Sequence, residues 1–260
     1  MKPFLNPAAR AWRTDGVTGD PRAFHRSLPG YAPTPLRDLP DIARRLGLGR
    51  VLAKDESDRF GLPAFKLLGA SYAVHRAVEQ QRPAALVTAT DGNHGRALAR
   101  TGRLLGLPVH VYVPAGVHPQ AVAAIESEQA AVHRVAGDYD EAVRHARAAA
   151  ADLGALLVQD TAWPGYERIP GWVVDGYATM FEEVDEQLAR LQVAPDVVVV
   201  PVGVGSLALA ALRHYRDRSR TQVPALVSVE PDCAACVLAS LHAGEPTSVV
   251  TGETIMAGLN

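Results

Sequence analysis

One lysine stands in a part of the sequence where its chemistry would be unusual. Lys66 lies between Phe65 and the apolar pair Leu67 and Leu68, at the point where a helix is predicted to begin. An apolar pocket disfavours the ammonium form of a lysine and frees the amine to attack a carbonyl carbon. Lys66 is therefore a candidate Schiff-base nucleophile. The alternative is a lysine whose stem lies along apolar surface while its head stays in water.

A second candidate is the glycine-containing segment Gly203-Val204-Gly205-Ser206. It follows the apolar run of residues 197 to 200 and precedes a helical pattern. A strand that turns into a helix through glycines directs backbone N–H groups and the positive end of the helix dipole at one spot, which suits a phosphate. The segment lacks the lysine of a Walker motif and the third glycine of a dinucleotide fingerprint. A phosphate loop and a plain tight turn both remain open.

Two acidic residues follow predicted strands. Asp91 comes after the run of residues 84 to 89 and precedes Asn93, and Asp160 comes after the run of residues 155 to 158. The carboxyl ends of parallel strands are where such sheets bind ligands. Asp91 could act there as an acid or base and Asn93 could hydrogen-bond a ligand oxygen. Equally, Asp91 or Asn93 could cap a helix, and Asp160 could cap a loop.

The elements that must position these residues alternate regularly, since short apolar runs are separated by amphipathic helical patterns. Predicted strands cover residues 51–55, 84–89, 109–113, 131–135, 155–158, 197–200 and 225–230, and predicted helices cover residues 39–46, 67–81, 93–105, 119–128, 139–153, 172–191, 206–215 and 233–241. Residues 1 to 35 are rich in proline and are predicted to be irregular. The alternation predicts an α/β fold of parallel sheets flanked by helices. The apolar run 197–200 is expected in the middle of such a sheet.

Composition favours a small-molecule partner. The 260 residues include 26 basic and 28 acidic side chains, so the net charge of −2 offers no footprint for nucleic acid or an anionic membrane. No apolar run reaches membrane-spanning length and the N-terminus lacks the apolar core of a signal peptide, so a soluble cytoplasmic protein is expected. Cys233 and Cys236 are too few for a closed zinc site. We expect two thiols packed on a helix, with a redox dithiol as the alternative.

Several motifs together resemble the pyridoxal-phosphate enzymes of the tryptophan synthase β fold type (fold type II), and within them the diaminopropionate ammonia-lyase family. The resemblance extends in order from about residue 30 to residue 260. The motifs are Arg59-Phe60-Gly61-Leu62 with Ala64-Phe65-Lys66, Ala89-Thr90-Asp91-Gly92-Asn93-His94-Gly95-Arg96, Gln159-Asp160-Thr161-Ala162-Trp163 with Gly165-Tyr166, Gly203-Val204-Gly205-Ser206, and Thr254-Ile255-Met256-Ala257-Gly258-Leu259-Asn260.

The resemblance implies a pyridoxal 5′-phosphate cofactor and a role for each candidate. Lys66 would form the Schiff base, the Gly203–Ser206 loop would hold the phosphate, and Asn93 would hydrogen-bond the 3′-oxygen of the pyridine ring. In the family, the counterparts of Lys66 and Asp91 deprotonate opposite enantiomers of the substrate, and Asp160 would hold or protonate the leaving amine. The implied reaction is α,β-elimination of ammonia from 2,3-diaminopropionate, which yields pyruvate. The family also implies a homodimer.

The resemblance further implies two domains, with a small α/β domain of residues 73–160 inserted into a large cofactor-binding domain of residues 1–72 and 161–260. Family members continue past the final Gly-Leu-Asn, so we expect a large domain that is incomplete at its C-terminus and exposes apolar surface. Pro63 and Ala70 also depart from the family pattern. Two alternatives therefore remain: a related lyase, synthase or dehydratase acting on another amino acid, and a shortened, catalytically weak homologue that binds the cofactor or a partner.

Overall fold

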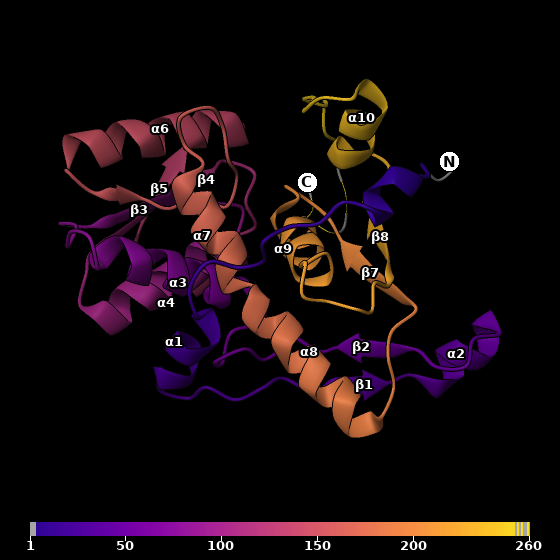
Figure 1. Cartoon of the computed structure of the whole chain (residues 1–260). Helices are drawn as coiled ribbons and strands as arrows, with labels where there is room; N and C mark the ends of the chain where they lie inside the picture. Colours follow the sequence, from indigo (N-terminus) through magenta and orange to yellow (C-terminus); the bar gives the residue numbers. More distant parts are fainter. Residues whose placement is uncertain (1–3, 253, 255, 257–258, 260) are drawn as a thin grey trace.

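A four-stranded parallel sheet forms one half of the molecule (Figure 1). The computed structural model describes residues 4–252, 254, 256 and 259. The strands are β3 (Leu86–Ala89), β4 (Val109–Pro114), β5 (Ala131–Val135) and β6 (Leu156–Leu157), arranged in the order β5-β4-β3-β6. The crossovers contain α4 (Asn93–Leu105), α5 (Pro119–Glu126) and α6 (Tyr139–Asp152). The α/β alternation predicted from the sequence is confirmed, and all four strands fall inside the predicted small domain.

The strand order places a switch point between β3 and β6. The chain proceeds from β3 outward through β4 to β5 and then returns to the other side of β3, where Leu86 pairs with Leu156. Both faces of β3 are covered, because Val87 and Ala89 pack against α6 while Leu86 packs in the cluster that includes α4. Figure 1 shows α6 on one side of the sheet and α3 and α4 on the other. Ligands of such sheets bind beyond the strand ends at a switch point of this kind.

The second half of the molecule is built on a two-stranded parallel sheet. It contains β7 (Val197–Pro201) and β8 (Ala225–Val229), which are followed by α9 (Ser206–Tyr215) and α10 (Cys236–Ala243) respectively. The expectation that residues 197 to 200 lie in the middle of a sheet is wrong for the described residues, in which β7 pairs only with β8. Val197 and Val199 are 53% and 61% exposed, because nothing in the described part of the chain covers that face.

Long helical elements connect the two halves. The predicted helix 67–81 is α3 (Lys66–Val78), and the single helix predicted over 172–191 is two helices, α7 (Arg168–Gly176) and α8 (Ala178–Leu191). They follow one another in Figure 1 and are separated at Tyr177, whose carbonyl accepts from Met180 N, three residues on. The tighter turn at Tyr177 is what divides the predicted helix.

The N-terminal residues are more ordered than predicted. They contain a 3-10 helix, η1 (Pro7–Arg10), and α1 (Pro21–Ser27), which begins because Asp20 accepts from Ala23 N at 2.8 Å and Pro21 occupies the first helical position. Two short strands, β1 (Leu36–Asp38) and β2 (Leu52–Lys54), pair antiparallel on either side of α2 (Pro40–Leu46). Only β2 and α2 were expected from the sequence. The proline-rich composition concealed η1, α1 and β1.

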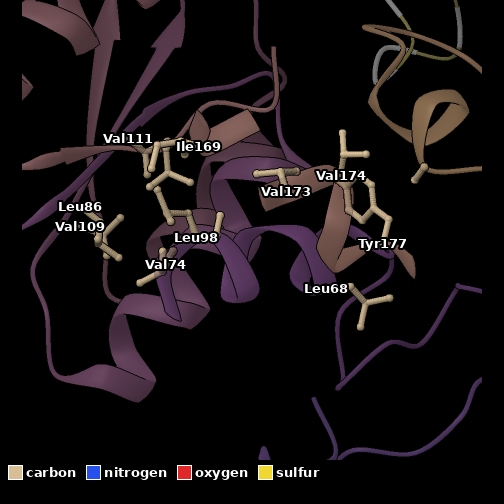
Figure 2. Packing of buried hydrophobic residues seen from close by; sticks show 14 of the residues in the cluster. Leu68, Val74, Leu86, Leu98, Val109, Val111, Ile169, Val173, Val174 and Tyr177 are labelled. Atoms are coloured by element: carbon tan, nitrogen blue, oxygen red, sulfur yellow. The ribbon is translucent and has the colours of Figure 1, made fainter. Parts of the chain in front are cut away.

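Two glycines let α3 and α7 cross closely. A Cβ atom added to Gly176 would lie 2.5 Å from the Leu68 carbonyl oxygen, and one added to Gly69 would lie 2.5 Å from Tyr177 Cε1. Figure 2 shows Leu68, Val173, Val174 and Tyr177 packed around this crossing. Because no side chain separates the two helices there, Tyr177 is held against the first turn of α3.

No helix in the described part of the chain combines the length and the apolar character needed to cross a membrane. No disulfide joins Cys233 and Cys236. The predicted helix 233–241 begins later, at Cys236, so the two thiols are not on one helix as expected. The α-helix starts there because the Glu230 carboxylate accepts from Val237 N at 2.7 Å and Leu238 N at 2.9 Å.

Candidate active site

A buried ion pair joins two of the predicted site residues. Lys66 Nζ lies 2.6 Å from Asp160 Oδ2, and the two side chains are 17% and 8% exposed. Burial alone would lower the pKa of Lys66, but the Asp160 carboxylate and Tyr177 raise it above its usual range. The expectation that an apolar pocket frees the Lys66 amine is therefore wrong for the protein alone, because an opposite charge outweighs desolvation.

The same pair holds Asp160 ionised. Burial raises the pKa of the Asp160 carboxyl, but the Lys66 ammonium and His94 lower it to a net value well below its usual range. Asp160 Oδ2 also lies 3.9 Å from His94 Nδ1. The lowered pKa favours the carboxylate form of Asp160 in a mostly buried position, which suits recognition of a cation.

Adjacent strands bring the two acids together. Asp91 follows β3 and Asp160 follows β6, and these strands are neighbours, with Val158 N donating to Val87 O at 2.8 Å. Burial and the Asp160 carboxylate both raise the pKa of Asp91. The site at the edge of the sheet therefore contains the Lys66 ammonium, the Asp160 carboxylate with a lowered pKa, and the Asp91 carboxyl with a raised pKa.

The start of α4 is capped by neither predicted residue. Thr90 Oγ1 accepts from Gly92 N at 3.0 Å and from Gly95 N at 3.1 Å, so Asp91 and Asn93 are not used as caps. Asn93 is exposed and Asp91 is half-buried. The geometry therefore favours the ligand-binding interpretation of these two residues over the capping interpretation.

The Gly203–Ser206 loop has the backbone shape expected of an anion-binding turn. Gly205 adopts the left-handed conformation, with φ +87°, and α9 begins at the next residue, Ser206, which is 7% exposed. The Cys236 thiol donates to the Gly203 carbonyl oxygen at 3.2 Å and so fixes the start of the loop. Val204, in contrast, is 41% exposed.

Three residues not predicted from the sequence belong to the same neighbourhood. The His94 Nε2–H donates to the Val158 carbonyl oxygen at 2.8 Å, which orients the ring beside Asp160. Burial, Asp160 and Asp91 raise the pKa of Tyr139, so this phenol lies near both acids. Tyr177 is fully buried next to Lys66, and burial raises its pKa to about 12. His94 stands inside one of the motifs quoted above, whereas nothing in the sequence analysis pointed to Tyr139 or Tyr177.

A cavity of about 520 Å³ lies elsewhere and contains none of the predicted site residues. Its lining includes Thr34, Arg37, Asp55 and Phe60. The charged groups of the candidate site are thus separate from this cavity. The predicted motif at residues 254 to 258 lies partly outside the described residues.

Comparison with known proteins places the chain in a family. Residues 27–260 match the family described as pyridoxal-phosphate dependent enzyme. The chain belongs to this family. The resemblance inferred from the motifs and the predicted fold class are thereby confirmed.

The relatives of this pyridoxal-phosphate dependent enzyme are longer than the chain itself. Diaminopropionate ammonia-lyase of Salmonella typhimurium is 39% identical over 99% of this chain and 70% of its own length. A crystal structure of diaminopropionate ammonia lyase from Escherichia coli in complex with D-serine superposes with a TM-score of 0.86 at 36% identity, covering 92% of this chain and 65% of that one. Another, in complex with an aminoacrylate-PLP azomethine reaction intermediate, gives a TM-score of 0.85 over 66% of its length. The chain spans about two thirds of the length of these proteins.

The residues present fit pyridoxal phosphate. The carbonyl group of the cofactor would bond to a mostly buried lysine, and Lys66 is such a residue. The phosphate of the cofactor would need backbone N–H donors at a helix start, and Gly205 and Ser206 supply them. The Tyr177 hydroxyl is buried, and no group among the described residues meets it in hydrogen-bond geometry, as expected of a group that faces a ligand. The assignment of individual roles to Lys66, Asp91, Asn93, Asp160 and the Gly203–Ser206 loop stays a prediction.

Proposed function

We propose that this protein is a pyridoxal-phosphate-dependent ammonia-lyase that eliminates ammonia from 2,3-diaminopropionate and yields pyruvate and ammonia. The observation that carries the proposal is the cluster of Lys66, Asp160 and Asp91 at the switch point of the parallel sheet. The names of its relatives supply the reaction class. We further propose a homodimer, as the family implies, and a cytoplasmic location, as the sequence without a signal-peptide core suggests.

The cofactor, when bound to Lys66, supplies an electron sink for the negative charge that develops at the substrate α-carbon. The residues of the chain supply charge recognition and proton transfer. Asp160 binds the β-ammonium group of the substrate, because its carboxylate stays ionised and already accepts from a cation at 2.6 Å. A hydroxyl leaving group needs no such counter-charge, so Asp160 favours a diamino acid over serine or threonine.

Proton removal from the α-carbon falls to Lys66 or Asp91. The raised pKa of Asp91 makes it a better base than an ordinary carboxylate once it has lost its proton. Lys66 and Asp91 come from different elements, α3 and the turn after β3. We propose that each serves one enantiomer of the substrate.

An assay of 2-oxo acid release by the purified protein tests the proposal, because 2,3-diaminopropionate and serine would yield pyruvate and threonine would yield 2-oxobutyrate. The protein is saturated with pyridoxal phosphate and offered the L and D forms of 2,3-diaminopropionate, L- and D-serine, and L-threonine. Pyruvate from at least one diaminopropionate enantiomer, abolished by Lys66→Ala, is expected. Cofactor absorbance without pyruvate would reject this substrate, and faster turnover of serine or threonine would favour a dehydratase. Absence of any cofactor absorbance would reject the enzyme altogether.

A further inference from the structure

Tyr177 is a buried polar residue that the mechanism above does not use. Its side chain is fully buried, yet its hydroxyl has no hydrogen-bond partner in the described part of the protein. A buried hydroxyl without a partner costs free energy, so natural proteins retain few of them. A ligand that supplies the missing partner would account for its presence.

The neighbours of Tyr177 show which ligand atom the hydroxyl would meet. Lys66 and Ser206 are the polar neighbours of the hydroxyl, because both side chains lower the pKa of Tyr177, yet neither meets it in hydrogen-bond geometry in the described part of the chain. Lys66 begins α3 and would bind the carbonyl carbon, while Ser206 begins α9 at the predicted phosphate loop. In pyridoxal phosphate the carbonyl and the phosphate-bearing methylene occupy adjacent ring carbons, so a hydroxyl that neighbours both Lys66 and Ser206 would be near the phosphate of a bound cofactor.

The side chain of Tyr177 is tightly packed in this place. A Cβ on Gly69 would lie 2.5 Å from Tyr177 Cε1, and Phe65 contacts the Tyr177 ring edge-on with centroids 5.0 Å apart. Figure 2 shows Tyr177 beside Val174 at the end of α7. Two packing partners from α3 and its cap thus fix the ring, although no group in the described part of the chain meets its hydroxyl in hydrogen-bond geometry.

We propose that the Tyr177 hydroxyl is a cofactor-binding group that donates a hydrogen bond to a phosphate oxygen of pyridoxal phosphate. This inference rests on the proposed cofactor site and adds a side-chain donor to the backbone donors of the Gly203–Ser206 loop. The contact changes no covalent bond, so its expected effect is on the affinity of the protein for the cofactor.

The test compares pyridoxal phosphate with pyridoxal, which lacks the phosphate. Both are titrated by absorbance into apoprotein of the wild type, of Tyr177→Phe, and of Tyr215→Phe as a control. Tyr215 is another buried tyrosine, 2% exposed, packed on Phe181 and His214. Tyr177→Phe should weaken pyridoxal phosphate binding by about 10- to 100-fold and leave pyridoxal binding unchanged, since hydrogen bonds to charged groups are among the stronger ones. Tyr215→Phe should change neither.

The melting temperature of the apoprotein provides a readout independent of the cofactor. Tyr177→Phe keeps the packed ring and removes only the unpartnered hydroxyl, so the apoprotein should melt at the same temperature or slightly higher. A clear fall in melting temperature would show a structural hydroxyl and overturn the inference.

Three further outcomes have distinct meanings. Equal loss of affinity for pyridoxal and its phosphate would place the hydroxyl at the ring or at Lys66 and overturn the phosphate contact. Unchanged affinity for both would overturn the inference while leaving the proposed function standing. A wild-type protein that binds neither compound would overturn both.

Discussion

At the scale of single residues, the Lys66–Asp160 pair decides the charge state of the site. Burial works against both charges, yet the 2.6 Å contact leaves the pKa of Lys66 raised and that of Asp160 lowered. A buried ion pair of this kind adds little net stability, but removal of one partner is costly because the other charge stays buried alone. The protein alone therefore keeps Lys66 as an ammonium ion until a ligand carbonyl or a substrate cation rearranges the pair.

The first prediction concerns this pair in the apoprotein. Asp160→Asn should lower the free energy of unfolding by about 3 kcal/mol, because it strands the Lys66 charge in a buried position. Adding Lys66→Met to Asp160→Asn should restore a large part of that loss. Urea denaturation of the two single variants and the double variant measures the coupling between the residues. Strictly additive losses would show that the two side chains do not interact.

The second prediction concerns Asp91 as a base. Because its pKa is raised, kcat/KM for the enantiomer that it serves should increase with pH, up to an apparent pKa above the ordinary carboxyl value of about 3.9. Below that value Asp91 is protonated and cannot accept the α-proton. Asp91→Asn should reduce turnover of that enantiomer by about 100-fold or more and retain turnover of the other. Equal losses for L- and D-2,3-diaminopropionate would contradict separate bases.

At the scale of secondary structure, the close crossing of α3 and α7 sets the position of the site. Gly176 faces the backbone of α3, where a Cβ would lie 2.5 Å from the Leu68 carbonyl oxygen and 2.9 Å from Gly69 Cα. Backbone atoms cannot rotate away as side chains can, so the helices would have to separate. The first turn of α3 carries Lys66, and the residue after α7 is Tyr177, so separation of the helices would move both.

The third prediction follows from this crossing. Gly176→Ala should lower the free energy of unfolding by about 1 to 3 kcal/mol through overpacking and should also weaken binding of pyridoxal phosphate. Gly171→Ala, in the same helix, is the matched control, since a Cβ there meets nothing within 4 Å. Alanine also favours a helix over glycine, so Gly171→Ala should be neutral or slightly stabilising. Thermal melts and cofactor titrations of both variants provide the comparison.

The sequence predicted the elements better than their arrangement. Apolar periodicity located α4, α5, α6 and their strands, because local pattern and chain order are enough for these crossovers. The adjacency of β3 and β6, which brings Asp91 to Asp160, depends on strand order and is not encoded in any local pattern. The protonation of Lys66 likewise depends on a residue 94 positions away. Apolar neighbours in sequence were a misleading guide to its charge state.

At the scale of the whole molecule, a buried ionic cluster connects the residues between Tyr31 and Arg59 to α8. Glu183 is fully buried and accepts from Arg59 Nη1 at 2.7 Å, Lys54 Nζ at 2.7 Å and the Tyr31 hydroxyl at 2.9 Å. Residues before Lys66 are thereby joined to residues after Asp160. This connection supports the predicted large domain of residues 1–72 and 161–260, which stays a prediction.

The same cluster holds the loop that leads to Lys66. Arg59 is fully buried and pairs with Glu56 as well as Glu183, and the next residue, Phe60, has a φ of +56° that is unusual for a bulky side chain. The Phe60 carbonyl oxygen in turn accepts from Arg100 of α4 at 3.0 Å. The loop is thus held between the α8 side and the four-stranded sheet.

The fourth prediction concerns Glu183 and the stability of the whole chain. Glu183→Gln should lower the free energy of unfolding by about 3 kcal/mol near neutral pH, because it removes the counter-charge of two buried cations. Asp41→Asn in α2 is the control, because Asp41 and its partner Arg44 are 82% and 72% exposed. An exposed pair of this kind contributes about 0 to 1 kcal/mol.

The stability difference between wild type and Glu183→Gln depends on pH, and this dependence follows from the pKa of Glu183. Burial raises this pKa, but Arg59 and Lys54 lower it to a net value below its usual range. A carboxyl with a lower pKa in the folded state contributes fully above its unfolded value of about 4.3, and the contribution is lost as pH falls through the folded value. The stability difference between wild type and Glu183→Gln should therefore be constant from about pH 7 to 5 and shrink below about pH 4. A difference that grows on acidification would show that Glu183 is protonated in the native cluster, and the two halves of the chain would then be joined by hydrogen bonds without a carboxylate charge.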